Sequence, residues 1–277
     1  MGQDLMSTEP TLTAIIIARN EEEMIANCID TLQWANAVLV VDTGSSDHTR
    51  EIATRQGAEV ISAQGSNFSD WRNEAAKKVK TDWMFYVDAD ERVTPALAKA
   101  IQGRLRRPEF DAFTITRNNI HYGKWMQHGG WQNDTLLRVF RTAKLKGWKG
   151  EVHEHAEIVG RIGSIEEPLV HLTHRSIYDG LRKSIDWTDV EARLMLEAKH
   201  PRVGSLRLIK IVIFDFFGRV IFKMAWKDGQ EGMIEAMTQT MNRFLVYTRL
   251  WEMQQQPPVS KRYDRIEQQI QKLWKQS

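Results

Sequence analysis

Three almost uninterrupted apolar runs in the first third of the chain constrain its fold more than any other feature. Leu12–Ala18, residues 37–41 and residues 83–87 each end in polar side chains and have the length of strands buried on both faces. A further short strand is predicted at Glu59–Ser62. Because helical patterns separate these strands, we predict βαβ units and an α/β fold with a doubly wound parallel sheet.

The helices predicted between the strands follow from apolar spacing and from capping residues. Apolar positions from Ile25 to Leu32 recur on one face of a helix predicted over residues 21–35. Ser46 or Asp47 is the expected N-cap of the next helix, which Gly57 ends. Two more helices are predicted at residues 69–79 and at residues 94–107.

The third apolar run stops in Asp88-Ala89-Asp90, two carboxylates that lie two residues apart. On an extended chain both side chains point to the same side, because side chains alternate along a strand. Asp88 and Asp90 can then share a hard cation such as Mg²⁺ or Mn²⁺, which prefers oxygen ligands. An acidic turn at a strand end is the alternative interpretation. Arg19, Asn20 and Asp42 follow the first two strands, at the edge where parallel sheets bind ligands.

The whole-chain totals exclude several classes of protein. The net charge of +2, from 38 basic and 36 acidic residues, does not indicate a nucleic-acid-binding protein. Cys28 is the single cysteine, which excludes an intrachain disulfide, and its place on an apolar helix face indicates a core residue. Residues 1–10 are polar and lack a signal-sequence pattern, and no run of 18 residues lacks charge. We therefore expect a disordered N-terminal tail and a cytoplasmic protein.

The segment from about residue 111 to residue 167 differs in character from the part before it. Short strands at residues 112–117 and 136–140 alternate with turns, which predicts a mixed or antiparallel extension. The segment is rich in tryptophan and histidine, at spacings that match no zinc-binding pattern. A pocket of aromatic rings that stack on a sugar is one explanation, and ordinary core tryptophans are the other. The residues concerned are His121, Trp125, His128, Trp131, Trp148, His153 and His155.

From Ser176 onward the pattern is helical. Residues 206–226 are dense in Ile, Phe and Leu but are interrupted by charged residues, which excludes a simple membrane span. The stretch suits one helix, or two helices hinged at Gly218, lying in a membrane interface, and a buried helical pair is the alternative. Other helices are predicted at residues 177–199, 229–254 and 262–275, the last with Ile266, Ile270 and Leu273 as a contact face.

Four motifs resemble, in type and order, those of family 2 glycosyltransferases, which are inverting nucleotide-sugar enzymes with the GT-A fold. They are Arg19-Asn20-Glu21-Glu22, residues 41–49 (VDTGSSDHT), Trp71-Arg72-Asn73-Glu74-Ala75, and Asp88-Ala89-Asp90. Residues 148–154 (WKGEVHE) are similar to a run in a subgroup that includes lipopolysaccharide inner-core β-1,4-glucosyltransferases. The resemblance implies a Rossmann-like catalytic domain at residues 11–175 with a mixed-strand acceptor extension. A helical region at residues 176–260 and a short terminal helix at residues 261–277 would follow.

The resemblance also implies roles for individual residues. Asp42 is expected to form a hydrogen bond with the nucleotide base, for which uracil is the first candidate. Arg72 is expected to lie near the diphosphate. Asp88 is expected on the ribose side and, with Asp90, on a Mg²⁺ or Mn²⁺ ion that bridges the phosphates. The remaining residues implied in the nucleotide pocket are Ala18, Arg19, Asn20, Glu22, Ser45 and Ala89.

Inversion requires one carboxylate to take the proton from the acceptor hydroxyl. Glu154 is the first candidate for this base, Glu151 the second and Asp134 the third. On an extended strand Glu151 and Glu154 point to opposite faces, so both reach one pocket only if the chain turns between them. The histidines expected to orient the base, or to contact the metal or a phosphate, are His153, His171 and His174.

The sequence therefore predicts an enzyme that moves a hexose from a UDP-sugar to a lipopolysaccharide-core or other lipid-linked acceptor. Glucose is the first candidate for this hexose. The enzyme would work in peripheral contact with the inner face of the cytoplasmic membrane and bind no nucleic acid. A nucleotidyltransferase is one alternative, but its usual glycine-rich, basic loop is replaced here by residues 18–23 (ARNEEE). A non-catalytic nucleotide-sugar-binding protein is the other, and the sequence leaves it open.

Overall fold

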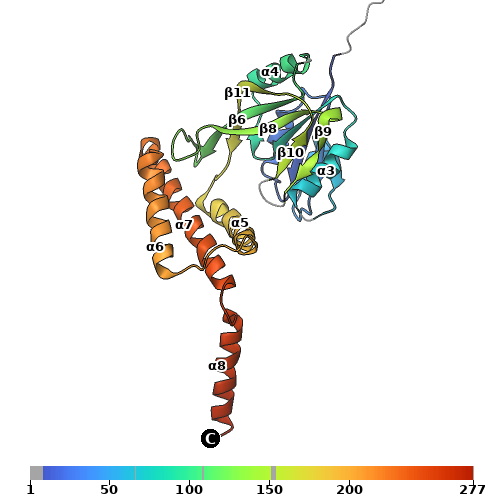
Figure 1. Cartoon of the computed structure of the whole chain (residues 1–277). Coiled ribbons are helices and arrows are strands. Elements are labelled where there is room, and N and C mark those ends of the chain that lie inside the picture. Colours follow the sequence, from blue (N-terminus) through green and yellow to red (C-terminus); the bar gives the residue numbers. More distant parts are fainter. Residues whose placement is uncertain (1–8, 66, 108, 151–153, 277) are drawn as a thin grey trace, which may run out of the picture. The chain divides into compact units, whose positions relative to one another are not determined.

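The computed structural model describes residues 9–65, 67–107, 109–150 and 154–276. Two residues expected in the site, Glu151 and His153, lie outside this range, as does the N-terminal tail up to residue 8. The chain divides into two compact units (Figure 1). The first comprises Met1–Trp125 and Gln132–Thr173, and the second comprises Met126–Trp131 and His174–Ser277.

Four parallel strands form the N-terminal half of the sheet in the first unit. They are β1 (Leu12–Ala18), β2 (Ala37–Asp42), β3 (Glu59–Ser62) and β4 (Trp83–Asp88), in the order β3-β2-β1-β4. β1 lies between β2 and β4, and in its register Ile16 faces Val40 on one side and Val87 on the other. These strands confirm the predicted doubly wound arrangement, because the nearly continuous apolar runs occupy its middle.

The other half of the sheet is mixed, as predicted. From β4 it continues through β8 (Asp134–Arg141), β6 (Ala112–His121) and β11 (Ile162–Leu172) to β5 (Glu91–Arg92). β8 runs antiparallel to both of its neighbours, whereas β6 and β11 are parallel. The smaller elements are β7 (Lys124–Trp125), which pairs with β6, the 3₁₀ turn Thr142–Lys144, and the hairpin of β9 (Leu145–Lys149) and β10 (His155–Ile158).

The helices of the first unit are α1 (Ile25–Asp30), α2 (Thr49–Arg55), α3 (Phe68–Lys78) and α4 (Pro95–Leu105). Thr94 caps α4 by accepting a hydrogen bond from the Leu97 amide, with Pro95 in the first turn, as predicted. The prediction of a helix over residues 21–35 was wrong in length, because α1 has only six residues between turns. The backbone N–H groups of Glu21 and Glu22 are bonded to the second loop instead of entering the helix.

The N-cap predicted for α2 was also wrong. His48, not Ser46 or Asp47, is the N-cap residue. The carboxylate of Asp47 accepts hydrogen bonds from the amides of Thr49 (3.0 Å) and Glu22 (3.1 Å), so it ties the two loops together.

Apolar side chains fill both faces of the sheet. One face buries Ile16, Phe85 and Cys28, and the other buries Ile15 and Tyr86. The prediction that Cys28 is a core residue is confirmed, because its side chain is fully buried and burial raises the pKa of its thiol. The core therefore fixes the carboxyl ends of β1, β2 and β4 as a rigid edge.

The second unit is helical. α7 (Gly229–Met253) packs on α5 (Ile177–Glu197) and on α6 (Ser205–Phe217), and α6 and α7 run side by side in Figure 1. After α6 the chain continues as a π-helix at Gly218–Phe222 and a 3₁₀ turn at Ala225–Asp228. Gly218 therefore marks a change of helix type, not a hinge between two α-helices. α8 (Val259–Trp274) is the C-terminal helix.

The face of α6 that points away from α7 is apolar. Leu206 and Phe214 are 76% and 73% exposed, and Phe222 in the following turn is 83% exposed. Asp215 and Arg219 lie on the side toward α7, where they pair at 2.8 Å and Asp215 accepts a hydrogen bond from Thr240, whereas Lys210 is exposed on the side of Leu206 and Phe214. This polarity is the reverse of that of an ordinary surface helix. Among the helices that the structure describes, none combines the length and apolar content needed to cross a bilayer.

Candidate active site

The loops after β1 and β2 are joined by hydrogen bonds at the carboxyl edge of the sheet. The backbone of Asn20 has a positive φ of 56°, and its N–H donates to Ser45 Oγ at 2.9 Å. The side-chain oxygen of Asn20 accepts from the amide of Ser46 at 2.8 Å, and Glu22 accepts from the amide of His48 at 3.1 Å. The structure thus brings the two predicted motifs together into one turn structure, which Asn favours at positive φ.

Asp42 lies at the end of β2 and is almost fully buried. Its carboxylate accepts hydrogen bonds from the amides of Ser45 (3.2 Å) and Gly44 (3.4 Å), and Arg50 lies 3.6 Å away. The carboxylate therefore shapes the loop in which it sits. Its expected contact with a nucleotide base stays a prediction. Ala18 is buried beside it, where its carbonyl accepts from the Thr43 amide.

The premise that Asp88 and Asp90 extend from one strand is wrong. β4 ends at Asp88, and Ala89 and Asp90 form a turn that leads into β5. The two carboxylates consequently have different neighbours. Asp88 lies among arginines, whereas Asp90 lies beside His171. A turn forms here because the Asp88 amide donates to the Glu91 side chain at 2.8 Å.

Asp88 and Glu91 share one guanidinium. Arg138 on β8 lies 2.7 Å from an Asp88 oxygen and 2.6 Å from a Glu91 oxygen, and Arg117 on β6 lies within 3.8 Å of both. Glu91 is fully buried, while about a third of the Asp88 side chain (35%) is exposed. Of this cluster only Asp88 was predicted from the sequence as a site residue, whereas Glu91, Arg117 and Arg138 were not. The one sequence signal for the cluster is that Arg117 and Arg138 occur among the apolar residues of two predicted strands.

The surroundings set the ionisation of these two carboxylates differently. Burial raises the pKa of Glu91 above its ordinary value despite the nearby Arg138. Burial acts in the same direction on Asp88, but the guanidinium groups of Arg138, Arg72 and Arg117 outweigh it and hold the pKa of Asp88 well below its usual range. Asp88 is therefore a carboxylate at neutral pH, with its oxygens directed toward cationic side chains.

We expect Arg138→Met to destabilise the first unit by about 3–5 kcal/mol at neutral pH, because it leaves Glu91 as a buried charge without its closest cation. Since the pKa of Glu91 is raised, its protonated form suits the buried site. The loss relative to the parent chain should therefore shrink as the pH falls toward the ordinary pKa of Glu and grow as the pH rises. Denaturant unfolding at several pH values measures this.

Arg141→Met is the matched control, because Arg141 lies on the same strand but pairs with Asp111 at 3.3 Å in a more exposed position. Its cost should be about 1 kcal/mol or less and independent of pH in the same range. Equal losses in the two variants would show that Arg138 contributes nothing beyond an ordinary surface pair.

Asp90 and His171 form the part of the site that fits a divalent cation. His171 Nε2 lies 3.5 Å from Asp90 Oδ1, and its Nδ1 lies 2.6 Å from the Asn119 side-chain oxygen. Asn119 Nδ2 in turn donates to Asp134 at 3.0 Å, which fixes the amide orientation and leaves its oxygen to accept from Nδ1–H. In the neutral ring Nε2 then offers its lone pair beside a carboxylate, as in metal sites where a second residue orients the histidine.

Asp134 is held as part of this chain of contacts. One of its carboxylate oxygens accepts from Arg117 Nη2 at 2.7 Å, from Arg117 Nε at 2.9 Å and from Asn119. These donors orient Asp134 toward the arginine and the amide. Its role as the third candidate for the catalytic base stays a prediction.

Arg72 links the first candidate base to the acidic cluster. It projects from α3, and its Nη1 forms an ion pair with Glu154, while Nη2 lies 4.0 Å from Asp88. The guanidinium lies 4.5 Å from the ring centroid of Trp148, and the Arg72 carbonyl accepts from the Tyr86 hydroxyl at 3.0 Å. Trp148 is therefore a core residue on which Arg72 stacks. Arg72, Asp88 and Glu154, which belong to three different sequence motifs, therefore lie close together.

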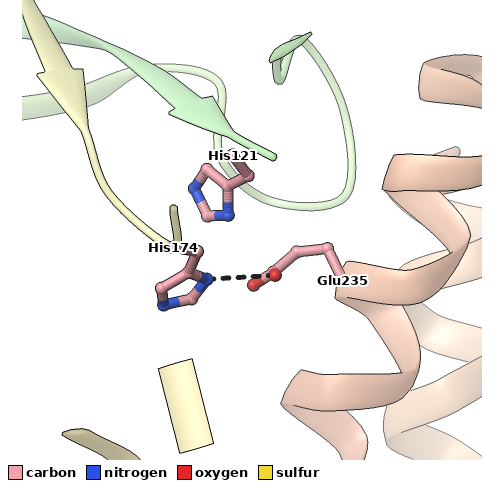
Figure 2. A group of neighbouring side chains, drawn as sticks. All are labelled: His121, His174 and Glu235. Carbon is pink, nitrogen blue, oxygen red and sulfur yellow. Dashed lines mark hydrogen bonds and ion pairs between the residues drawn. The ribbon is translucent and has the colours of Figure 1, made fainter. Parts of the chain in front are cut away.

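The other tryptophans and histidines divide between different settings. Trp125 is 48% exposed. In the second unit the backbone amide of His128 donates a hydrogen bond to the Asp228 carboxylate. His174 also belongs to the second unit, where its Nδ1 lies 3.1 Å from Glu235 on α7 (Figure 2). His174 is therefore paired with a buried carboxylate of its own unit.

Comparisons with known proteins identify chains that are similar to this one. A family model described as "Glycosyl transferase family 2" matches residues 13–159, more than half of the chain. The lipopolysaccharide core biosynthesis glycosyltransferase LpsC of Rhizobium meliloti (strain 1021) is 26% identical over 255 residues, which cover 87% of this chain and 92% of LpsC. A glycosyltransferase of Rickettsia bellii is 24% identical over 266 residues, 87% of this chain and 86% of its own length.

Two solved structures are similar at low sequence identity. S. aureus TarS 1-349 is 14% identical with a TM-score of 0.46, over 86% of this chain and 90% of that chain. Glucosyl-3-phosphoglycerate synthase from Mycobacterium tuberculosis, in complex with Mn²⁺, UDP and glucosyl-3-phosphoglycerate, is 15% identical with a TM-score of 0.46, over 70% of this chain and 82% of that chain.

Proposed function

Because the chain belongs to glycosyl transferase family 2, and is thus a glycosyltransferase, we propose the following reaction for it. It transfers a hexose from a UDP-sugar to a hydroxyl of a lipopolysaccharide-core or other lipid-linked glycan. Glucose is the first candidate for this hexose. The anomeric configuration is inverted, and a divalent cation assists the departure of UDP. Similarity to a lipopolysaccharide core glycosyltransferase over most of both chains supports the choice of acceptor.

The observation that carries this proposal is the bridge that Arg72 makes between Glu154 and Asp88. A transferase of this kind needs a base on the acceptor side and neutralising groups on the diphosphate side, within one sugar's reach of each other. Arg72 holds Glu154, the proposed base, near Asp88 at the end of β4. The loops that carry Asn20 and Asp42 follow neighbouring strands at the same edge, where parallel sheets bind nucleotides.

Asp90 and His171 are the residues that would hold the cation, with Asp88 beside them as a prediction from the sequence. When bound, a Mg²⁺ or Mn²⁺ ion supplies positive charge to the leaving diphosphate. The arginines around Asp88 are each paired with a carboxylate as well, so they balance the acidic side chains at this end of β4 and leave charge stabilisation of the diphosphate to the cation. His171 keeps one tautomer through Asn119, so no reorganisation of the ring is required when the nucleotide binds.

Glu154 is the proposed base. Its carboxylate would take the proton of the acceptor hydroxyl as that oxygen attacks the anomeric carbon from the side opposite UDP. The ion pair with Arg72 holds the carboxylate in place before the acceptor arrives. Ionised Asp88 competes for the same guanidinium, so Arg72 is shared and does not neutralise Glu154 alone.

The test is a transfer assay with the purified chain, a panel of UDP-hexoses and other nucleotide sugars, and both extracted lipopolysaccharide-core acceptors and soluble acceptors, read by mass spectrometry. One hexose should be added from one UDP-sugar, faster with Mn²⁺ or Mg²⁺ than with chelator. Transfer only from other nucleotide sugars would reject the UDP assignment. Absence of transfer to every lipid-linked acceptor, with transfer to a soluble one, would reject the proposed acceptor.

We further propose that the enzyme works in peripheral contact with the inner face of the cytoplasmic membrane, where a lipid-linked acceptor resides. The outward apolar face of α6 supports this, because apolar side chains are exposed while its ion pair is turned inward. Basic residues outnumber acidic ones from residue 202 to residue 227, which favours anionic lipid.

Replacing Leu206 and Phe214 together by Ser should lower partition to anionic vesicles about a hundredfold, since each buried side chain contributes roughly 1.5 kcal/mol or more. The melting temperature should not fall, because both side chains are exposed to water. The matched control is Tyr178→Ser with Ile185→Ser, which removes equally exposed apolar groups from α5. Vesicle co-sedimentation measures both, and equal binding of the two double variants would contradict membrane docking through α6.

A further inference from the structure

α8 carries an apolar stripe that stays exposed to water along the whole helix. Tyr263, Ile266, Ile270 and Leu273 are each at least half exposed, and no residue of the helix is buried. An isolated helix of 16 residues is only marginally stable in water, so a sequence that keeps four large apolar groups on it requires a partner. The identity of that partner can be read from the spacing of the stripe.

The spacing is that of a coiled-coil seam. Tyr263, Ile266, Ile270 and Leu273 follow each other at intervals of three, four and three residues, a 3.5-residue repeat with a and d positions apolar. The positions on the outer side carry polar and charged residues. Trp274, next to Leu273, is also exposed (78%) and widens the stripe at its C-terminal end.

Charges beside the seam are complementary to a second copy of the same helix. With Tyr263 at position a, Arg262 occupies g and Glu267 occupies the following e position. In a parallel pair of helices these g and e′ positions lie next to each other across the seam, so Arg262 of each copy meets Glu267 of the other. In an antiparallel pair g faces g′ and e faces e′, so Arg262 and Glu267 would not meet.

We propose that α8 joins two copies of this chain in a parallel two-stranded coiled coil. Ile270 at position a followed by Leu273 at position d is the combination that favours two strands. The described seam spans two heptads, so the dimer is weak and depends on protein concentration. This inference concerns assembly and is independent of the reaction proposed above.

The test is sedimentation equilibrium of the full chain over a range of concentrations, with two matched variants. Ile270→Lys places a charge in the seam and should raise the dimer dissociation constant about tenfold or more. Gln268→Lys adds the same charge on the outer side of the same helix and should leave the constant within about twofold of the parent value. Thermal unfolding of both variants should match the parent at low concentration, because no buried residue is changed.

A charge exchange tests the orientation. Arg262→Glu alone should weaken the dimer, because it faces Glu267 of the second copy, and Arg262→Glu combined with Glu267→Arg should restore it. A chain that is monomeric at every concentration overturns the proposal, as does a dimer that Ile270→Lys leaves intact. If the parent is monomeric and Ile270→Lys lowers vesicle binding instead, the stripe serves a membrane and the proposal is wrong.

Discussion

Replacing Asp90 by Asn should lower kcat/KM for metal-stimulated transfer by about a thousandfold, because a catalytic cation contributes several kcal/mol to charge stabilisation in the transition state. Asp90 Oδ1 lies 3.5 Å from His171 Nε2, and the two side chains are the proposed ligands of the cation. Asparagine keeps the size of the side chain but removes its charge. Initial rates at increasing Mn²⁺ concentration give both the maximal rate and the activation constant.

Asp82→Asn is the control for this variant. Asp82 directly precedes β4, at the end of the strand away from Asp90, and its carboxylate accepts hydrogen bonds from the Thr11 amide (2.9 Å) and hydroxyl (2.8 Å). This variant should lose some stability and keep its metal-activated rate. If Asp90→Asn retains the parent rate and the parent activation constant, the cation is held elsewhere and the assignment of Asp90 fails.

The second large effect is expected from Glu154→Gln, which should lower kcat by about 10²–10⁴-fold. Glutamine still offers an oxygen to Arg72, so the arrangement of Arg72 and Asp88 should persist and UDP affinity should change little. The loss would therefore appear in kcat and not in donor binding. Single-turnover rates with saturating donor separate the two quantities.

Three further variants show which carboxylate is the base. Glu157→Gln, on the strand β10 that follows Glu154, removes a half-exposed carboxylate paired with Lys149 and should leave kcat unchanged. Asp134→Asn and Glu151→Gln test the other two candidates. A parent-like kcat in Glu154→Gln, together with a large loss in one of these, would transfer the role of base to that residue.

Much of the first unit could be predicted from local sequence. The strands Leu12–Ala18 and Glu59–Ser62 were predicted at their observed bounds, because continuous apolar runs between turn residues leave few alternatives. The helix at residues 21–35 was overestimated since apolar periodicity does not reveal that the amides of Glu21 and Glu22 bond to a loop 25 or more residues away. Long-range hydrogen bonds override a local pattern there.

The candidate site was only partly predictable for the same reason. Asp88 and Asp90 could be selected because they stand at a strand end, and Arg72 because it stands in a motif that resembles one of the family. Arg138 and Asn119 could not, since their roles depend on strands β8 and β6 lying next to β4 and β11. A pairing of strands distant in sequence leaves no local signal in either one.

The measurement that tests the central claim most directly is calorimetric titration of the purified chain with UDP, with Mn²⁺ and with chelator, in the parent and in Asp90→Asn. We predict micromolar binding by the parent that requires the metal and is lost in the variant. Binding that is equal with Mn²⁺ and with chelator would contradict the metal-assisted mechanism while leaving the fold assignment in place. Absence of UDP binding under both conditions would contradict the proposed donor itself.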